Sequence, residues 1–171
     1  MRILVIDDKT EELERAKLAA EELQDEGLEI ETVNTREVNG IIEYVYSRLQ
    51  SGKYDGVVTD LMFNPVPKSQ RSSKFYEEDN TPPAGLLIVI CCISLGIPVS
   101  ICTDSGEGKL AKQMTKAGGG PGSVGDHRGQ YGWIKDTTGP IFPYLFYMSG
   151  EKIWQRAFYD LIDHNKRALA P

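Results

Sequence analysis

The sequence is poor in the residues that build zinc sites and disulfide scaffolds. It contains three cysteines and two histidines among 171 residues. Cys91, Cys92 and Cys102 are odd in number and lie in apolar runs, which favours reduced, buried thiols over a disulfide framework. His127 and His164 stand at no zinc-like spacing from these cysteines. The composition therefore argues against a disulfide-stapled or zinc-bound protein.

A long apolar run and a clustered basic surface are also missing. The most apolar segment, 85–102, is interrupted by Ser94, Gly96 and Pro98, so it does not suit a membrane span. The net charge of −6 argues against a nucleic-acid partner, because neutralising phosphates requires clustered basic residues. The first residues lead directly into a strand and do not resemble a signal peptide. We therefore expect a cytoplasmic protein that neither enters a membrane nor binds nucleic acid.

Strand-like apolar runs alternate with amphipathic stretches along the chain. This alternation predicts a parallel sheet with right-handed crossovers. The length and the 40% hydrophobic content suit one domain, 1–171, with a sizeable core. Connections rich in proline, glycine or aromatic residues predict inserted loops at about 64–84, 118–130 and 137–148. The predicted strands are 2–6, 28–33, 54–59, 97–102 and 131–134, and the predicted helices are 10–23, 37–49, 85–95, 106–117 and 149–161.

Acidic residues close two of the predicted strands. Asp7 and Asp8 follow the first strand, and Asp60 follows the third. In an open α/β sheet, ligands bind outside the carboxyl ends of the strands, so these carboxylates can converge despite their separation in sequence. Three carboxylates in one crevice repel each other, and a divalent cation that prefers oxygen ligands neutralises them; Mg²⁺ fits best.

Two further polar residues end predicted strands. Thr103 follows the fourth strand and Lys135 follows the fifth. A hydroxyl and an ammonium suit two oxygens of a phosphoryl group, while a metal ion takes a third. Mg²⁺ is held by one or two carboxylates, which leaves Asp60 to act as a nucleophile. The pattern predicts a magnesium-dependent site that accepts a phosphoryl group.

Four sequence blocks resemble the signature blocks of response-regulator receiver domains. They are Ile3-Leu-Val-Ile-Asp-Asp8, Asp55-Gly-Val-Val-Thr-Asp-Leu-Met62, Ile97-Pro-Val-Ser-Ile-Cys-Thr103 and Trp133-Ile-Lys135. The resemblance covers residues 1 to about 168 apart from the insertions. It implies a flavodoxin-like, doubly wound α/β fold with a five-stranded parallel sheet of order 2-1-3-4-5, which is the established order for such domains and not a deduction from this sequence.

The resemblance also implies a role for each site residue. Asp60 would be the phospho-accepting aspartate, and Asp7, Asp8 and Asp60 would hold the metal. Met62 would be a further metal ligand through its backbone carbonyl. Thr103 and Lys135 would contact the phosphoryl group. These assignments follow from matching positions in the four blocks.

The chain departs from the receiver pattern at several positions. Pro65 follows the acceptor by five residues instead of four, and the matching helix-opening glycine is Gly85, which implies a long insertion beside the acceptor. Asp104 replaces the usual small residue after the threonine, and Asp136 replaces the usual proline after the lysine. Gly132 stands where many receivers have an aromatic switch residue. The aromatic segment 140–148 is interpreted as either a cover of the core or a partner surface.

These observations predict a stand-alone response regulator, a phosphorylation-dependent signalling switch. A sensor histidine kinase or phosphotransfer protein would donate the phosphoryl group to Asp60, and output would be contact with a downstream protein target. We expect no enzyme activity beyond autophosphorylation from small donors and autodephosphorylation, and a monomer or weak homodimer. One alternative is a pseudo-receiver whose loop 64–84 binds a partner regardless of phosphorylation. A second is a magnesium-dependent phosphohydrolase, although Asp7 and Asp8 lack its usual Asp-x-Asp spacing.

Overall fold

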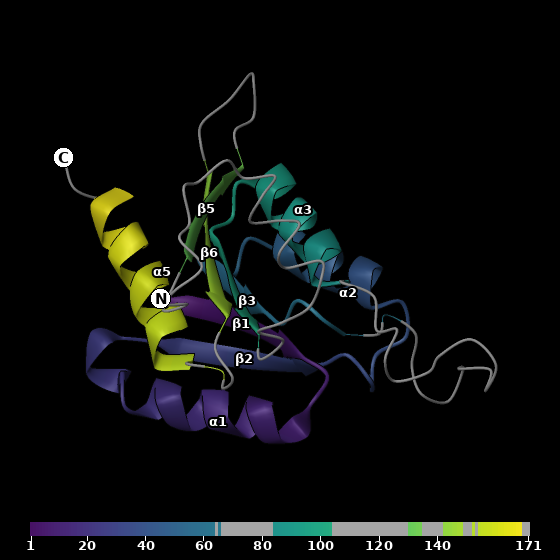
Figure 1. The fold of residues 1–171 in the computed structure, drawn as a ribbon, viewed down its shortest axis with the longest axis horizontal. Helices are drawn as coiled ribbons and strands as arrows, with labels where there is room; N and C mark the ends of the chain where they lie inside the picture. Colours follow the sequence, from purple (N-terminus) through teal and green to yellow (C-terminus); the bar gives the residue numbers. More distant parts are fainter. Residues whose placement is uncertain are drawn as a thin grey trace.

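The computed structural model describes residues 1–63, 65, 84–103, 130–134, 142–148, 152 and 154–168 (Figure 1). The predicted helix 106–117 lies outside these residues, as do Asp104, Lys135 and Asp136. The strands are β1 (Arg2–Asp7), β2 (Glu29–Asn34), β3 (Gly56–Thr59), β4 (Val99–Thr103), β5 (Gln130–Ile134) and β6 (Phe142–Met148), and the helices are α1 (Thr10–Glu21), η1 (Gln24–Glu26), α2 (Ile41–Gln50), α3 (Gly85–Leu95) and α5 (Trp154–Ala168).

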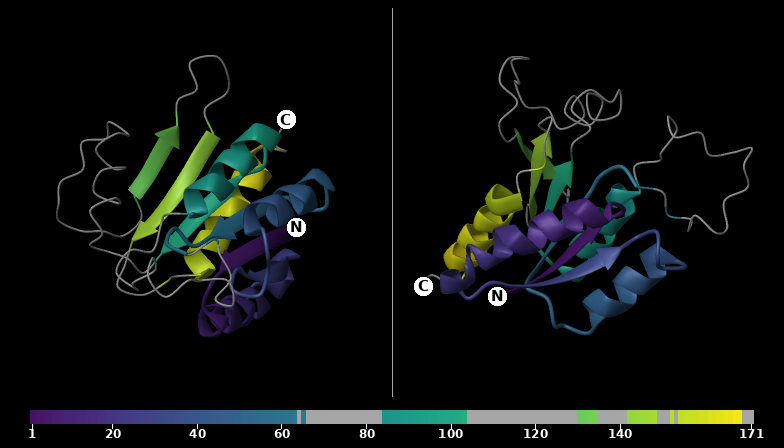
Figure 2. Two further views of the ribbon diagram at one scale, coloured as in Figure 1. Left: turned by 90° about the vertical axis from the view of Figure 1, so that its right-hand side faces the viewer. Right: turned by 90° about the horizontal axis from the view of Figure 1, so that it is seen from below.

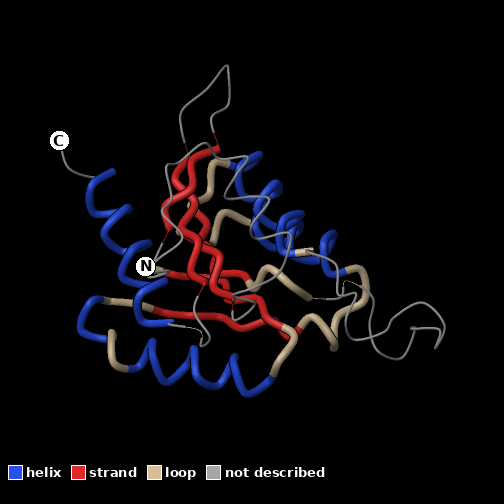
Figure 3. Tube along the Cα trace, viewed as in Figure 1, coloured by secondary structure: helices blue, strands red, loops and turns tan. Residues whose placement is uncertain are grey.

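The strands, red in Figure 3, form one sheet. Its order is β2-β1-β3-β4-β6-β5. β2, β1, β3 and β4 are parallel neighbours, which confirms the predicted order 2-1-3-4 for this part of the sheet. The next strand, β6, pairs in parallel with β4, and β5 pairs with β6 in antiparallel orientation at the edge. The described part of the chain therefore has an α/β architecture with alternating strands and helices.

The last two strands correct the sequence prediction. The strand predicted at 131–134 is present as β5, but it is not the parallel neighbour of β4. That place belongs to β6, which lies within the predicted inserted loop 137–148. The connection from β5 to β6 is too short for the helical crossover that parallel pairing needs, so the two strands form an antiparallel pair. The aromatic residues of β6 favour a strand.

Helices cover both faces of the sheet, as Figure 2 shows. α1 and α5 pack together on one face, and α2 and α3 pack together on the other. Successive side chains of β1 point to opposite faces: Ile3 and Val5 join the core under α1 and α5, whereas Leu4 and Ile6 join the core under α2 and α3. This double coverage explains why the first strand is a continuous apolar run.

The cysteines and the helices agree with two expectations from composition. Cys92 and Cys102 are buried and Cys91 is half-buried, as expected for thiols within apolar runs. Burial raises the pKa of the Cys92 thiol, which favours its neutral form. Among the helices in the described parts of the chain, none combines the length and the apolar character needed to cross a bilayer.

Candidate functional site

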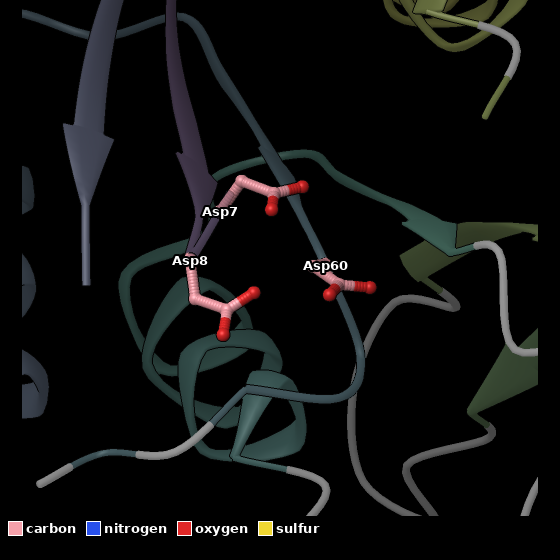
Figure 4. A group of neighbouring side chains, drawn as sticks. All are labelled: Asp7, Asp8 and Asp60. Atoms are coloured by element: carbon pink, nitrogen blue, oxygen red, sulfur yellow. The ribbon is translucent and has the colours of Figure 1, made fainter. Parts of the chain in front are cut away.

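Three carboxylates converge at the carboxyl edge of the sheet (Figure 4). Asp7 is the last residue of β1, Asp8 follows it, and Asp60 follows β3. β1 and β3 are hydrogen-bonded neighbours whose register pairs Ile6 with Thr59, which brings the two strand ends level. One carboxylate oxygen from each aspartate lies within 4.8 Å of those of the other two. The structure therefore confirms the convergence that the strand-end pattern predicted.

The cluster is buried and fixed by backbone hydrogen bonds. The exposed fractions are 0% for Asp7, 8% for Asp8 and 1% for Asp60. Oδ1 of Asp7 accepts the Lys9 N–H at 2.9 Å, and Oδ1 of Asp60 accepts the Leu61 N–H at 2.8 Å. These bonds set the direction of both side chains. A site held this way keeps its carboxylates close even though they repel one another.

A buried lysine joins the cluster from the far end of the chain. The Lys152 ammonium contacts Oδ2 of Asp7 and lies 3.3 Å from Oδ2 of Asp60, and its side chain is fully buried. It also lies 5.7 Å from the centre of the Trp154 ring. Lys152 stands shortly after β6, the parallel neighbour of β4, so it reaches the same edge of the sheet as the aspartates.

Lys152 was not predicted from the sequence. The lysine predicted for the site was Lys135, which lies outside the described residues. A signal was present in the sequence, because the aromatic run 142–148 has the residue types of a strand and Lys152 follows it closely. Reading that run as a strand would have pointed to Lys152 by the strand-end rule used for the aspartates.

An arginine contacts the cluster from another strand end. Arg36 follows β2, the neighbour of β1 on its other side, and its Nε and Nη2 atoms donate to Oδ2 of Asp8 at 3.1 Å and 2.8 Å. The sequence analysis did not single out Arg36. Its position just past the end of β2 was the available signal. Together with Lys152, it makes a second cationic contact to the acidic cluster.

The cluster carries an excess of negative charge. Three carboxylates against one ammonium and one guanidinium leave a formal charge of −1. The pKa of Asp7 is raised to about 6 as the net result of opposing effects: burial, the largest, raises it, the Lys152 ammonium lowers it, the Asp60 charge raises it, and the hydrogen bond from the Lys9 N–H lowers it. Burial outweighs these attractions, so the protonated carboxyl of Asp7 is favoured relative to an exposed aspartate.

Two further predicted site residues, Thr103 and Met62, lie at or near the same edge of the sheet. Thr103 is the last residue of β4 and is fully buried. Met62 follows Asp60 by two residues and its half-buried side chain packs against the core under α2 and α3. The metal-ligand role of its carbonyl and the phosphoryl contact of Thr103 stay predictions.

Gly85 brings the start of α3 directly against the candidate acceptor. Its N–H donates to the Leu61 carbonyl at 3.1 Å. A Cβ atom built on Gly85 would lie 2.0 Å from the Asp60 carbonyl oxygen and 2.8 Å from the Leu61 Cα, so no side chain fits there. The sequence analysis matched Gly85 to the helix-opening glycine of receivers. The residues on either side of the predicted insertion therefore lie close together, beside Asp60.

The donor set fits a small divalent cation. Within the residues that the structure describes, the one group of potential metal ligands is the triad of aspartates. Carboxylate oxygens are the ligands that Mg²⁺ prefers, and Mg²⁺ is usually held by one or two carboxylates together with water and phosphate oxygens. The formal negative charge of the cluster favours such an ion. Asp7, Asp8 and Asp60 could therefore hold a metal ion.

Comparisons with protein-family models, with curated proteins and with solved structures find no significant match to this chain. The strand of the fourth sequence block is β5, which is not the neighbour of β4, so the receiver resemblance depends on the first three sequence blocks and on two structural features. These features are the parallel order 2-1-3-4 and the buried triad Asp7, Asp8 and Asp60 at the carboxyl edge. Both are consistent with a receiver-like, flavodoxin-like fold with an acidic site that is compatible with phosphoryl acceptance.

Proposed function

We propose that this protein is a receiver-like signalling switch that accepts a phosphoryl group on Asp60. The observation that carries the proposal is the buried contact of Lys152 with Asp7 and Asp60 inside the acidic triad. A triad alone would suit any metal-binding site. A buried ammonium beside the candidate nucleophile adds the cation that a phosphoryl acceptor needs for charge neutralisation.

The residues divide the chemistry among them. Oδ1 of Asp60 is held by the Leu61 N–H, and Oδ2 faces the Lys152 ammonium, so the candidate nucleophile is fixed in direction beside a positive charge. A carboxylate oxygen of Asp60 forms the new bond to phosphorus as the bond from phosphorus to the donor's histidine nitrogen breaks. The donor imidazole keeps the electron pair and takes up a proton from water.

Asp7 and Asp8 would hold Mg²⁺ beside Asp60, and the ion when bound supplies positive charge to the phosphoryl oxygens. Lys152 pairs with Asp7 and Asp60 before phosphorylation and, in our proposal, with a phosphoryl oxygen afterwards. We therefore assign to Lys152 the phosphoryl contact that the sequence analysis predicted for Lys135. Thr103, at the end of β4, would donate its hydroxyl to another phosphoryl oxygen.

The partners follow from this chemistry. The donor would be a sensor histidine kinase or a phosphotransfer protein, because a phosphohistidine supplies an activated phosphoryl group for a carboxylate acceptor. The added charge and acceptor oxygens would reposition the loops after β4 and β6 and change the surface offered to a downstream protein. We propose no enzyme activity beyond self-phosphorylation from small donors and loss of the phosphoryl group.

Intact-mass spectrometry tests the proposal. The protein is incubated with Mg²⁺ and acetyl phosphate, alongside Asp60→Asn and the exposed control Asp25→Asn. We expect one phosphoryl adduct on the wild type and on Asp25→Asn, none on Asp60→Asn, and none when EDTA replaces Mg²⁺. An equal adduct on Asp60→Asn would move the acceptor elsewhere. No adduct on any variant would favour a binding module that acts without phosphorylation.

Two lysine variants test the residue assignment within the proposal. Lys152→Gln and Lys135→Gln are treated with acetyl phosphate in the same way, and the yield and lifetime of the adduct are compared. We expect Lys152→Gln to change both strongly and Lys135→Gln to resemble the wild type. The reverse result would return the phosphoryl contact to Lys135.

A further inference from the structure

The guanidinium of Arg36 is bound to the acidic cluster from its outer side. Its Nε and Nη2 atoms both donate to Oδ2 of Asp8, at 3.1 Å and 2.8 Å. Charge-assisted bonds of this kind are stronger than bonds between neutral groups. They occupy one oxygen of a carboxylate that the triad would otherwise offer to a metal ion.

The backbone around Arg36 is fixed against the site. The Thr35 N–H donates to the Asp7 carbonyl at 2.9 Å, and the Arg36 N–H donates to Oδ1 of Asn34 at 3.0 Å. Nδ2 of Asn34 in turn donates to the Thr10 hydroxyl at 3.0 Å. The end of β2 is thereby tied to the end of β1 and to the start of α1. The position of Arg36 is built into the site, and its long side chain is the part that can move.

The two cations of the cluster differ in their access to water. The Lys152 side chain is fully buried, so moving its ammonium would remove a buried counter-charge from Asp7 and Asp60. The Arg36 side chain is 45% exposed while its partner Asp8 is 11% exposed. A guanidinium that already faces solvent can move into water at small cost. Arg36 is therefore the cation that can leave, and Lys152 is the one that stays.

The net charge of the cluster relates the movement of Arg36 into solvent to the binding of a divalent ion. With Arg36 turned into solvent, three carboxylates and the Lys152 ammonium leave a formal charge of −2, which one divalent cation neutralises. With Arg36 in place, the same ion would approach a site of charge −1 and would lie close to a guanidinium of like charge. Binding of the ion at the cluster and binding of the Arg36 guanidinium to Asp8 therefore disfavour each other.

We propose that Arg36 is a displaceable counter-cation that competes with a divalent metal ion for Asp8. The strength of the ion pair between Arg36 and Asp8 sets the metal concentration at which the acidic site binds the ion. This inference rests on the proposed function, because it takes Asp8 as one of the metal carboxylates. Arg36 acts on the site through Asp8 and contacts no reacting atom.

Calorimetric titration with Mg²⁺ and with Mn²⁺ tests this competition directly, without reference to phosphorylation. The proteins are the wild type, Arg36→Gln, Arg36→Lys and the control Arg156→Gln. Arg156 is 57% exposed and pairs with Asp160 on α5, so the control removes the same charge from another ion pair. We expect Arg36→Gln to bind either ion roughly three- to tenfold more tightly, as the loss of a half-exposed ionic competitor implies. Arg36→Lys should lie between it and the wild type, and Arg156→Gln should match the wild type.

The Asp8→Asn background supplies a sharper control. If Arg36 acts through Asp8, Arg36→Gln should change metal affinity much less in that background than in the wild type. Circular dichroism and urea unfolding of each variant establish that the compared proteins are folded.

The possible outcomes separate this inference from the proposed function. Equal or weaker metal binding by Arg36→Gln would overturn the competition, and an adduct on Asp60 would still support the phosphoryl-accepting switch. Absence of metal binding by every variant would also overturn the competition. If the adduct on Asp60 were missing as well, the proposed function would fail with it.

Discussion

Replacing Asp7 with asparagine should stabilise the metal-free protein at neutral pH. The pKa of Asp7 is raised from 3.8 to about 6, first by burial and then by the charge of Asp60. The folded state therefore binds this proton more tightly than the unfolded state does. The stability that the group contributes is complete below pH 3.8 and is lost as the pH rises through about 6. At neutral pH the ionised carboxylate is a net cost to folding.

The size of the effect follows from the two pKa values. The interval from 3.8 to about 6, at about 1.36 kcal/mol per pH unit, sets a ceiling of roughly 3 kcal/mol at pH 7.5. Asparagine keeps an oxygen that can accept the Lys9 N–H, but it weakens the ionic contact with Lys152. We therefore expect Asp7→Asn to raise the free energy of unfolding by about 1–3 kcal/mol.

Urea unfolding in the presence of EDTA, at several pH values between about 4 and 8, measures this difference. The advantage of Asp7→Asn should be largest above pH 7 and should shrink toward zero as the pH falls from 6 to 4. The control Asp25→Asn removes a carboxylate from an exposed position and should stay within about 0.5 kcal/mol of the wild type. A less stable Asp7→Asn at pH 7.5, or a gain that does not vary with pH, would show that attraction to Lys152 outweighs burial.

Three further substitutions, one of them with a matched control, test the surroundings of the site by urea unfolding at pH 7.5. Lys152→Gln removes the fully buried cation and should cost about 3–5 kcal/mol, because it takes a buried counter-charge away from Asp7 and Asp60. A loss below about 1 kcal/mol would contradict the buried contact. Gly85→Ala should cost about 2 kcal/mol or more, because the added methyl group would clash with the backbone of Asp60 and Leu61. The control Gly96→Ala meets open space but has a φ of 69°, so it should cost about 1 kcal/mol. Equal losses would refute the close approach of Gly85 to Asp60. Trp154→Phe should cost about 1 kcal/mol by losing the 3.1 Å bond to Glu12, and an unchanged stability would count against that bond.

Local patterns in the sequence were sufficient to predict the acidic triad. Asp7, Asp8 and Asp60 directly follow apolar runs, and the carboxyl ends of neighbouring parallel strands meet at one edge of a sheet. The alternation of strands and helices predicted a parallel α/β sheet, and the resemblance to receiver domains implied the order 2-1-3-4 that the structure shows. Gly85 was matched through the receiver pattern, and the structure supplies the physical reason, because the start of α3 packs on backbone where no side chain fits.

The lysine and the arginine of the site depend on information that local patterns do not carry. Assigning Lys152 requires knowing that 142–148, and not 131–134, pairs with β4, and strand pairing is decided by contacts between distant segments. Pro143 and the aromatic residues around it also suit a connection, which hid the strand. Arg36 reaches Asp8 through a long side chain whose direction follows from the turn after β2.

The bond between the Gly85 N–H and the Leu61 carbonyl has a consequence for how this chain can vary. It joins the two ends of the stretch between these residues, so that stretch begins and ends at one point of the fold. The entropic cost of closing a flexible loop rises by only about 0.6 kcal/mol for each doubling of its length. Phe63 and Ala84 belong to the core, so variation is confined to the residues between them. There, residues can be gained, lost or replaced by a foreign peptide while Asp60 keeps its place in the sheet.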